Sequence, residues 1–165
     1  MYVLFVMRLK TRAVHIAGFT TAANGAYMKQ VARTLTDVSD GFLLYSRYLI
    51  MDRDTKYTEA FRDFLDREGV KPVRCPVPAP NCNAFAERFV RSIREESLDR
   101  IILFGEPSLR RTLREYVAHF RSERNHQGVG NRLLEPCARG NSTDGPIQCR
   151  KRLGGTLNSY RREAA

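Results

Sequence analysis

The chain has 165 residues and a formal net charge of +10, because 28 basic residues outnumber 18 acidic ones. This length suits one folded domain with a short appendage, and no apolar run reaches the roughly 18 residues that a membrane-spanning helix needs. The four cysteines match no zinc-binding spacing, and they indicate a reducing, cytoplasmic setting. Most of the basic residues are arginines, which favours a polyanionic partner such as nucleic acid. The alternative is an arginine-rich composition that is unrelated to binding.

The first half of the chain alternates apolar runs with amphipathic segments. Residues 2–7 and 13–19 are apolar runs on either side of a charged turn, and they predict a hairpin of two strands. Residues 25–38 place apolar side chains three and four positions apart, which predicts a helix. Residues 47–52 form another apolar run, and they predict a buried strand that ends on Asp52.

The pattern of alternating strands and helices continues to residue 123. Thr58 can cap a short helix. The strand predicted over residues 70–75 contains Pro72, which suits the edge of a sheet. Two further helices are predicted, over residues 83–103 and 108–123. The succession of elements is typical of an α/β domain with an antiparallel start.

The carboxyl-terminal part of the chain loses this periodicity. Residues 137–165 are polar and basic, and we expect a largely unstructured tail, although a small apolar patch returns at residues 153–160. The predicted organisation is therefore one domain over residues 1–136 followed by a basic tail over residues 137–165.

Two acidic residues stand out in this basic chain. Asp52 ends a predicted strand and Glu87 lies near the start of the long predicted helix, and rigid elements of this kind hold metal ligands well. Mg²⁺ is commonly bound by one or two carboxylates together with water and phosphate oxygens. The simpler interpretation is a surface ion pair between Glu87 and Arg91, four residues apart on the helix. Asp54 is a rival ligand or a turn residue.

Three motifs in the chain follow a recognisable order. The first is MDRDTKY at residues 51–57, and the second is NAFAE at residues 83–87. The third is FRSERNHQGVGNRLLEP at residues 120–136, and 34 residues separate Asp52 from Glu87. This order and spacing resemble the integrase catalytic core of bacterial insertion-sequence transposases and retroviral-type integrases.

The resemblance implies a ribonuclease H-like mixed sheet flanked by helices, and phosphoryl transfer on DNA with Mg²⁺ or Mn²⁺ as cofactor. Asp52 and Glu87 would be two of the three catalytic, metal-binding acids of the family. Basic residues near these acids would contact the DNA. These candidate DNA contacts are Lys56, Arg88, Arg91 and Arg94.

The resemblance is incomplete at the amino terminus. The family carries its first catalytic acid on a strand ahead of the hairpin, but no Asp or Glu occurs in this sequence before Asp37. We therefore expect a sheet that lacks its first, central strand, and unpaired strand edges that make the chain poorly stable. We also expect weak metal binding and no catalysis by the chain as written.

Two alternatives follow from the same gap. The start of the chain is wrongly assigned and the missing strand and acid lie upstream, or the protein is a non-enzymatic DNA-binding module, such as a dominant-negative regulator of an intact transposase. In each case the expected partner is DNA. A second copy of the chain or an intact transposase is the expected protein partner, and no membrane is involved.

Overall fold

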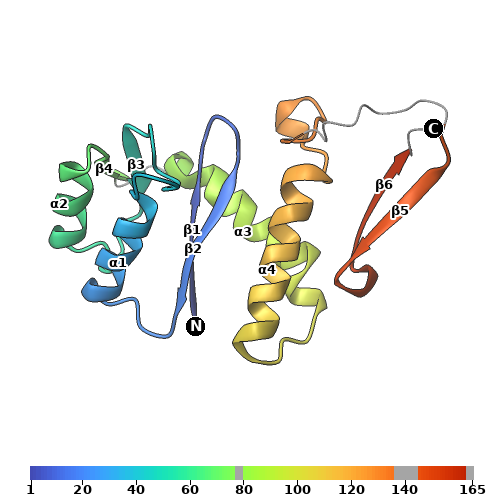
Figure 1. The fold of residues 1–165 in the computed structure, drawn as a ribbon, viewed down its shortest axis with the longest axis horizontal. Coiled ribbons are helices and arrows are strands. Elements are labelled where there is room, and N and C mark those ends of the chain that lie inside the picture. Colours follow the sequence, from blue (N-terminus) through green and yellow to red (C-terminus); the bar gives the residue numbers. More distant parts are fainter. Residues whose placement is uncertain (77–79, 136–144, 163–165) are drawn as a thin grey trace. The chain divides into compact units, whose positions relative to one another are not determined.

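The computed structural model describes residues 1–76, 80–135 and 145–162 (Figure 1). The chain divides into two compact units. The first unit comprises Met1–Met7 with Val14–Glu87, and the second comprises Arg8–Ala13 with Arg88–Ala165. Among the described residues, no helix is both long enough and apolar enough to span a membrane.

The strands of the first unit form two separate pairs. The hairpin predicted near the amino terminus is confirmed, since β1 (Tyr2–Met7) pairs with β2 (Val14–Thr20) in antiparallel register. Strand β3 (Tyr48–Met51) pairs with β4 (Lys71–Arg74) in parallel register. Among the described residues β4 has no second neighbour, so Pro72 lies in an edge strand as predicted.

Two capped helices cover these strands. Helix α1 (Gly25–Leu35) begins after Asn24, whose side chain accepts a hydrogen bond from the backbone of Tyr27. Helix α2 (Glu59–Arg67) begins after Thr58, which accepts a hydrogen bond from the backbone of Phe61 and so confirms the predicted cap.

Both strand pairs contribute to the core of the first unit. Leu4 of β1 and Met51 of β3 belong to one buried cluster with apolar side chains of α1 and α2. The helix predicted over residues 25–38 ends at Leu35, and Val38 is 90% exposed, so its expected place in the helix stripe is wrong. The other buried members are Met28, Val31, Ala32, Leu35, Leu43, Phe61, Leu65 and Val70.

The long predicted helix is shorter than expected. A short 3₁₀ turn, η1 (Pro80–Asn83), leads into α3 (Ala84–Glu96), which crosses from the first unit into the second. The helix stops before residue 103: the backbone of Ser97 has φ −141° and ψ −55°, and its hydroxyl donates to the carbonyl of Ile93 at 3.0 Å. Such a side-chain bond competes with continued helix formation.

An aromatic cluster forms the core of the second unit. Phe89 of α3 packs edge-on against Phe120 of α4 (Gly105–Ser122), with 5.1 Å between ring centroids. Tyr116 is fully buried beside both rings. The ring of His126 meets Phe120 edge-on at 4.5 Å. The apolar stripes predicted for the two helices are confirmed at these positions.

The expectation of a largely unstructured tail is wrong for residues 147–162. Strands β5 (Ile147–Arg152) and β6 (Leu157–Arg162) form an antiparallel hairpin around a turn at Leu153–Gly155. Leu157 is 4% exposed. The strands were missed because β5 has the composition of a solvated segment and is held by ion pairs to a distant helix. Residues 136–144 and 163–165 of the predicted tail lie outside the described part of the chain.

Candidate metal and nucleic-acid site

The loop after β3 arranges two acidic side chains around one lysine. Asp52 directly follows the strand, and its Oδ1 accepts a hydrogen bond from the backbone of Asp54 at 3.0 Å. The ammonium of Lys56 lies 2.6 Å from Asp54 Oδ2 and 3.9 Å from Asp52 Oδ1. The Lys56 side chain is only 14% exposed, whereas that of Asp52 is 53% exposed. Lys56 therefore neutralises part of the negative charge of this loop. This role was not part of the prediction that Lys56 contacts DNA.

The charges of this loop also act on neighbouring groups. The hydrogen bond from the Lys56 side chain holds the pKa of Asp54 below its usual value. Burial, together with the charges of Asp52 and Asp54, raises the pKa of the Tyr57 hydroxyl. The carboxylate of Asp54 is therefore ionised at neutral pH close to a neutral phenol.

The parallel strands bring the end of β4 to the same edge of the sheet. The backbone amide of Cys75 donates to the carbonyl of Met51 at 3.0 Å, and Arg53 Nε donates to the carbonyl of Cys75 at 2.8 Å. Burial raises the pKa of the Cys75 thiol, and the nearby Cys82 and Asp52 raise it further. The end of β3, the end of β4 and the turn η1 thus lie together.

Glu87 is positioned by the elements that precede it. It lies in the first turn of α3, directly after η1, and η1 contacts β3. Asp52 and Glu87 therefore belong to the same unit, and both are exposed. The described residues contain no group of three or more His, Cys, Asp or Glu side chains that could hold a metal ion. Two carboxylates remain as candidate ligands in this unit.

The three candidate arginines of α3 project from its exposed surface. Arg91 and Arg94 follow Glu87 by one and two helical turns, and both are exposed, as is Arg88. Arg94 Nε lies 3.9 Å from Asp99, a loose contact between two exposed side chains. Burial and the charge of Arg88 lower the pKa of Arg12 in the turn between β1 and β2. The three arginines of α3 therefore lie between Glu87 at the start of the helix and Glu95 and Glu96 at its end.

A comparison with known protein families finds one match in this part of the chain. Residues 68–133 match the family model of the integrase core domain. The match supports a relationship of this segment to the integrase and transposase catalytic-core superfamily. The match contains Glu87 and the three arginines of α3, whereas Asp52 and Lys56 precede it. Membership in this superfamily implies a function in DNA integration or transposition. No curated protein matches the chain.

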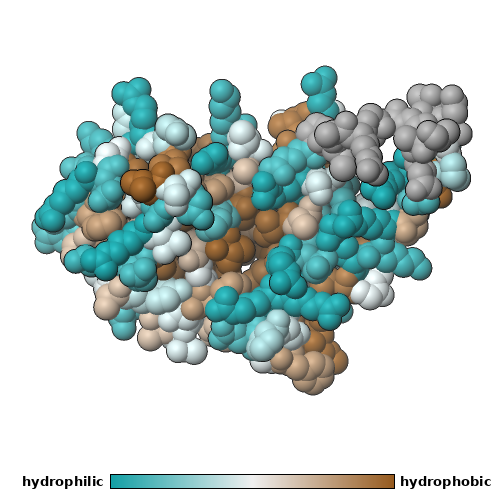
Figure 2. All heavy atoms as spheres, in the orientation of Figure 1, coloured by the Kyte–Doolittle hydropathy of each residue, from teal (hydrophilic) through white to brown (hydrophobic). Residues whose placement is uncertain are grey.

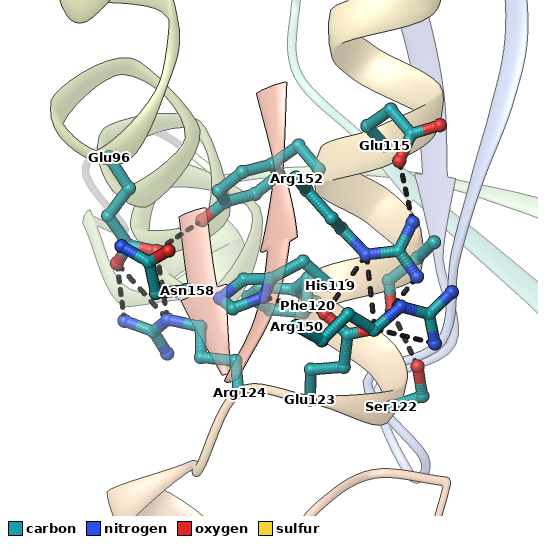
Figure 3. Close-up of polar contacts among 12 residues, drawn as sticks. Glu96, Glu115, His119, Phe120, Ser122, Glu123, Arg124, Arg150, Arg152 and Asn158 are labelled. Atoms are coloured by element: carbon teal, nitrogen blue, oxygen red, sulfur yellow. Dashed lines mark hydrogen bonds and ion pairs between the residues drawn. The ribbon is translucent and has the colours of Figure 1, made fainter. Parts of the chain in front are cut away.

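The third motif of the integrase core segment has a structural role in the second unit. Arg124 forms a bidentate ion pair with Glu96 of α3, with its Nη2 at 2.7 Å from Oε1. The hydroxyl of Tyr116 donates to the same carboxylate at 3.1 Å. His126 Nε2 lies 2.6 Å from the carbonyl oxygen of Phe120, and burial lowers the pKa of the imidazole. These contacts join α3 to the end of α4 (Figure 3).

A second ion-pair cluster, which the sequence reasoning missed, holds the carboxyl-terminal hairpin on α4. Arg152 contacts Glu115 and Glu123, and Arg150 contacts Glu123 from the same strand (Figure 3). His119 Nδ1 lies 3.1 Å from the Glu123 carboxylate. The only local signal for this cluster was the His119–Glu123 spacing of four residues on one helix face. The arginines that pair with Glu123 belong to β5, about thirty residues further along the chain. A local sequence pattern does not reveal a pair at this separation.

Proposed function

We propose that this protein binds DNA as a member of the integrase and transposase superfamily. In this proposal Asp52 and Glu87 are metal ligands at one edge of the first unit, and Arg91 and Arg94 contact the DNA. The observation that carries the proposal is the placement of Glu87. It stands in the first turn of α3 within the matched family segment, and η1 brings this turn towards the strand that ends at Asp52.

The donor chemistry of this edge suits a hard divalent cation. Asp52 and Glu87 would hold Mg²⁺ or Mn²⁺, the ions expected for the superfamily, and such an ion supplies charge stabilisation at a reacting phosphate when it is bound. Lys56 lies closer to Asp54 than to Asp52. Asp52 is therefore the carboxylate of this loop that is more open to a cation. With two acidic ligands instead of three, we expect weak binding.

The fold that we propose is a ribonuclease H-like sheet without its central strand. In support, β1–β2 and β3–β4 are separate two-stranded sheets, yet they share one buried core. Figure 2 shows hydrophobic atoms at the surface near the β3–β4 pair. In β3 itself Tyr48 is 57% exposed and Ile50 is 39% exposed. A strand between β1 and β3 would pair with both and cover this surface.

Without that strand the chain is proposed to bind DNA but not to transfer strands. In the described residues no third acidic side chain joins Asp52 and Glu87, which supports an inactive centre. The second candidate function, a non-enzymatic DNA-binding protein or dominant-negative regulator of an intact transposase, is favoured by the same observation. A strand-transfer assay with Mn²⁺ tests this point, and product formed by the purified chain would contradict it.

DNA binding is tested by fluorescence anisotropy of a labelled duplex over a series of salt concentrations. The test variant is Arg91→Ala with Arg94→Ala, and the matched control is Lys29→Ala with Arg33→Ala, two exposed cations of α1. Loss of two phosphate contacts lowers the slope of log K against log salt by about 1.8. The control keeps the slope of the wild-type chain. Equal slopes for both variants, or no binding by the wild type at about 50 mM salt, would overturn the proposal.

Metal binding is tested separately by calorimetric titration with Mn²⁺. Asp52→Asn and Glu87→Gln are each expected to weaken a low-affinity signal, because each removes one charged ligand. Asp63→Asn is the control, since Asp63 is an exposed acid of α2. Tight binding of two ions by the wild type, or an unchanged signal in both site variants, would contradict this assignment.

A further inference from the structure

The carboxyl-terminal hairpin is the most uniformly basic folded element of the second unit. Residues 145–162 contain five basic side chains and no acidic one. They form two full strands with six paired positions, so the charges are displayed on a defined scaffold. The basic residues are Arg150, Lys151, Arg152, Arg161 and Arg162.

One face of this hairpin is used to attach it to α4. Arg152 donates to Glu115 at 2.6 Å and to Glu123 at 2.8 Å, and Arg150 Nη1 lies 3.2 Å from Glu123. Leu157, which pairs with Arg152 in the register, is buried. The face that carries these side chains is therefore directed to the helix, and two of the five cations are neutralised there.

The opposite face is directed to solvent. Side chains alternate between the two faces of a strand, so Ile147, Cys149 and Lys151 share a face that Arg150 and Arg152 do not. The register adds Tyr160, the partner of Cys149, to the same face. Tyr160 is 71% exposed and Ile147 is 63% exposed. Lys151 is exposed as well, and so is Arg162, the partner of Ile147 in the register.

We propose that this outer face of β5 and β6 is a second nucleic-acid contact surface, on which Lys151 and Arg162 bind phosphates of duplex DNA and Tyr160 packs against the backbone. The inference rests on the proposed DNA-binding function and adds a surface that the candidate site does not contain. A two-stranded ribbon has the width that the major groove of duplex DNA admits.

Charge complementarity selects this partner. A phosphate backbone presents one charge at short, regular intervals, and cations on a rigid ribbon release counterions when they neutralise it. The ion pairs to Glu115 and Glu123 fix the ribbon, so that little conformational entropy is lost when DNA binds. An acidic protein surface presents its negative charges at less regular intervals than a phosphate backbone. Measured binding to duplex DNA distinguishes these two kinds of partner.

The test uses the full chain and a labelled duplex, as for the α3 variants. Lys151→Ala with Arg162→Ala removes two cations outside the contacts with α4, and we expect the salt slope to fall by about 1.8. Tyr160→Ala is expected to weaken binding severalfold. Ile147→Thr is the matched control, because it changes an exposed neutral side chain of the same face, and we expect it to bind like the wild type.

The outcomes separate this inference from the proposed function. If the hairpin variant binds like the wild type while Arg91→Ala with Arg94→Ala binds more weakly, the second surface is wrong and the proposed function stands. If only the hairpin variant is weakened, the ribbon is the contact and the α3 assignment is wrong. Absence of binding by the wild type overturns both.

A second measurement covers a variant that fails to fold. Hydrogen exchange of the wild-type chain, measured with and without duplex DNA, reports on residues 147–162 without any substitution. Slower exchange of β5 and β6 in the presence of DNA supports the contact. Unchanged exchange at a DNA concentration that saturates the anisotropy signal overturns it.

Discussion

Replacing Arg152 by methionine removes a guanidinium that bridges two glutamates of α4 while it keeps an apolar stem of similar length. Nη1 lies 2.6 Å from Glu115, and Nε and Nη2 lie 2.9 Å and 2.8 Å from Glu123. The side chain of Arg152 is 12% exposed and that of Glu123 is 8% exposed. The substitution leaves a nearly buried carboxylate with His119 and Arg150 as its remaining partners.

The magnitude follows from the ionisation of Glu123. Burial alone would raise its pKa, but hydrogen bonds from Arg152 and His119, with the charges of Arg152 and Arg150, lower it from 4.5 to about 2. At about 1.4 kcal/mol for each pKa unit, this change represents about 3 kcal/mol of stability at neutral pH. Arg152 makes the largest of the lowering interactions, so we expect Arg152→Met to destabilise the second unit by about 2 kcal/mol.

The pH dependence has a definite sign. Because the folded pKa of Glu123 is below its unfolded value, the stabilisation is fully present above pH 4.5 and is lost as the pH falls towards about 2. The difference between wild type and Arg152→Met is therefore expected to be full at pH 7, reduced at pH 3 and small only below about pH 2.

The assay is urea unfolding followed by far-ultraviolet circular dichroism, since the chain has no tryptophan. A loss of about 2 kcal/mol moves the midpoint by about 1 M urea. Arg161→Met is the matched control, because Arg161 is exposed on the same hairpin, and its midpoint is expected to stay close to that of the wild type. Hydrogen exchange of β5 and β6 locates the loss in the hairpin and α4.

Two results would refute this reasoning. If Arg152→Met and Arg161→Met unfold at the same urea concentration, the contacts of Arg152 with Glu115 and Glu123 add no net stability. If the difference between Arg152→Met and the wild type is the same at pH 7 and pH 3, the ionised Glu123 is not its source.

Three further predictions concern particular side chains. Gly18→Ala is expected to cost about 1–3 kcal/mol, because a Cβ would lie 2.2 Å from the hydroxyl of Tyr27, which donates to a β2 carbonyl; the Tyr27→Phe background should recover part of this loss in thermal melts. Tyr57 and Tyr116 should stay protonated in an ultraviolet pH titration after other tyrosines ionise, because burial and nearby carboxylates raise both pKa values, and stability should fall as the pH rises above 10. Early ionisation of all seven tyrosines would contradict this. Gly69→Ala should lower the free energy of unfolding by about 1 kcal/mol, since φ is +80° there; an unchanged urea midpoint would be inconsistent with that strain.

Much of the local structure could be predicted because local interactions form it. Apolar runs and a charged turn are sufficient to specify the β1–β2 hairpin, and the cap at Thr58 follows from a hydroxyl ahead of an amphipathic segment. The same holds for the candidate site, since Glu87, Arg91 and Arg94 share a helix and their spacing alone puts them on one face.

The tertiary structure decided the features that depend on distant partners. The helix with Glu87 ends at residue 96, where the backbone of Ser97 leaves the helical conformation, and no glycine or proline marks this point in the sequence. Lys56 was expected on DNA, yet its ammonium lies between Asp54 and Asp52, a geometry that only the folded loop defines.

By itself the sequence determined the type and order of the elements up to residue 123, the capped helix start at Thr58 and the family segment around Glu87, because each depends on residues within a few positions of one another. Only the tertiary structure decided that the chain divides at Glu87 and that residues 147–162 fold as a hairpin. The physical reason is separation along the chain. Glu115 and Glu123 meet Arg152 across 37 and 29 residues, and attraction between charges so far apart in sequence produces no periodic pattern.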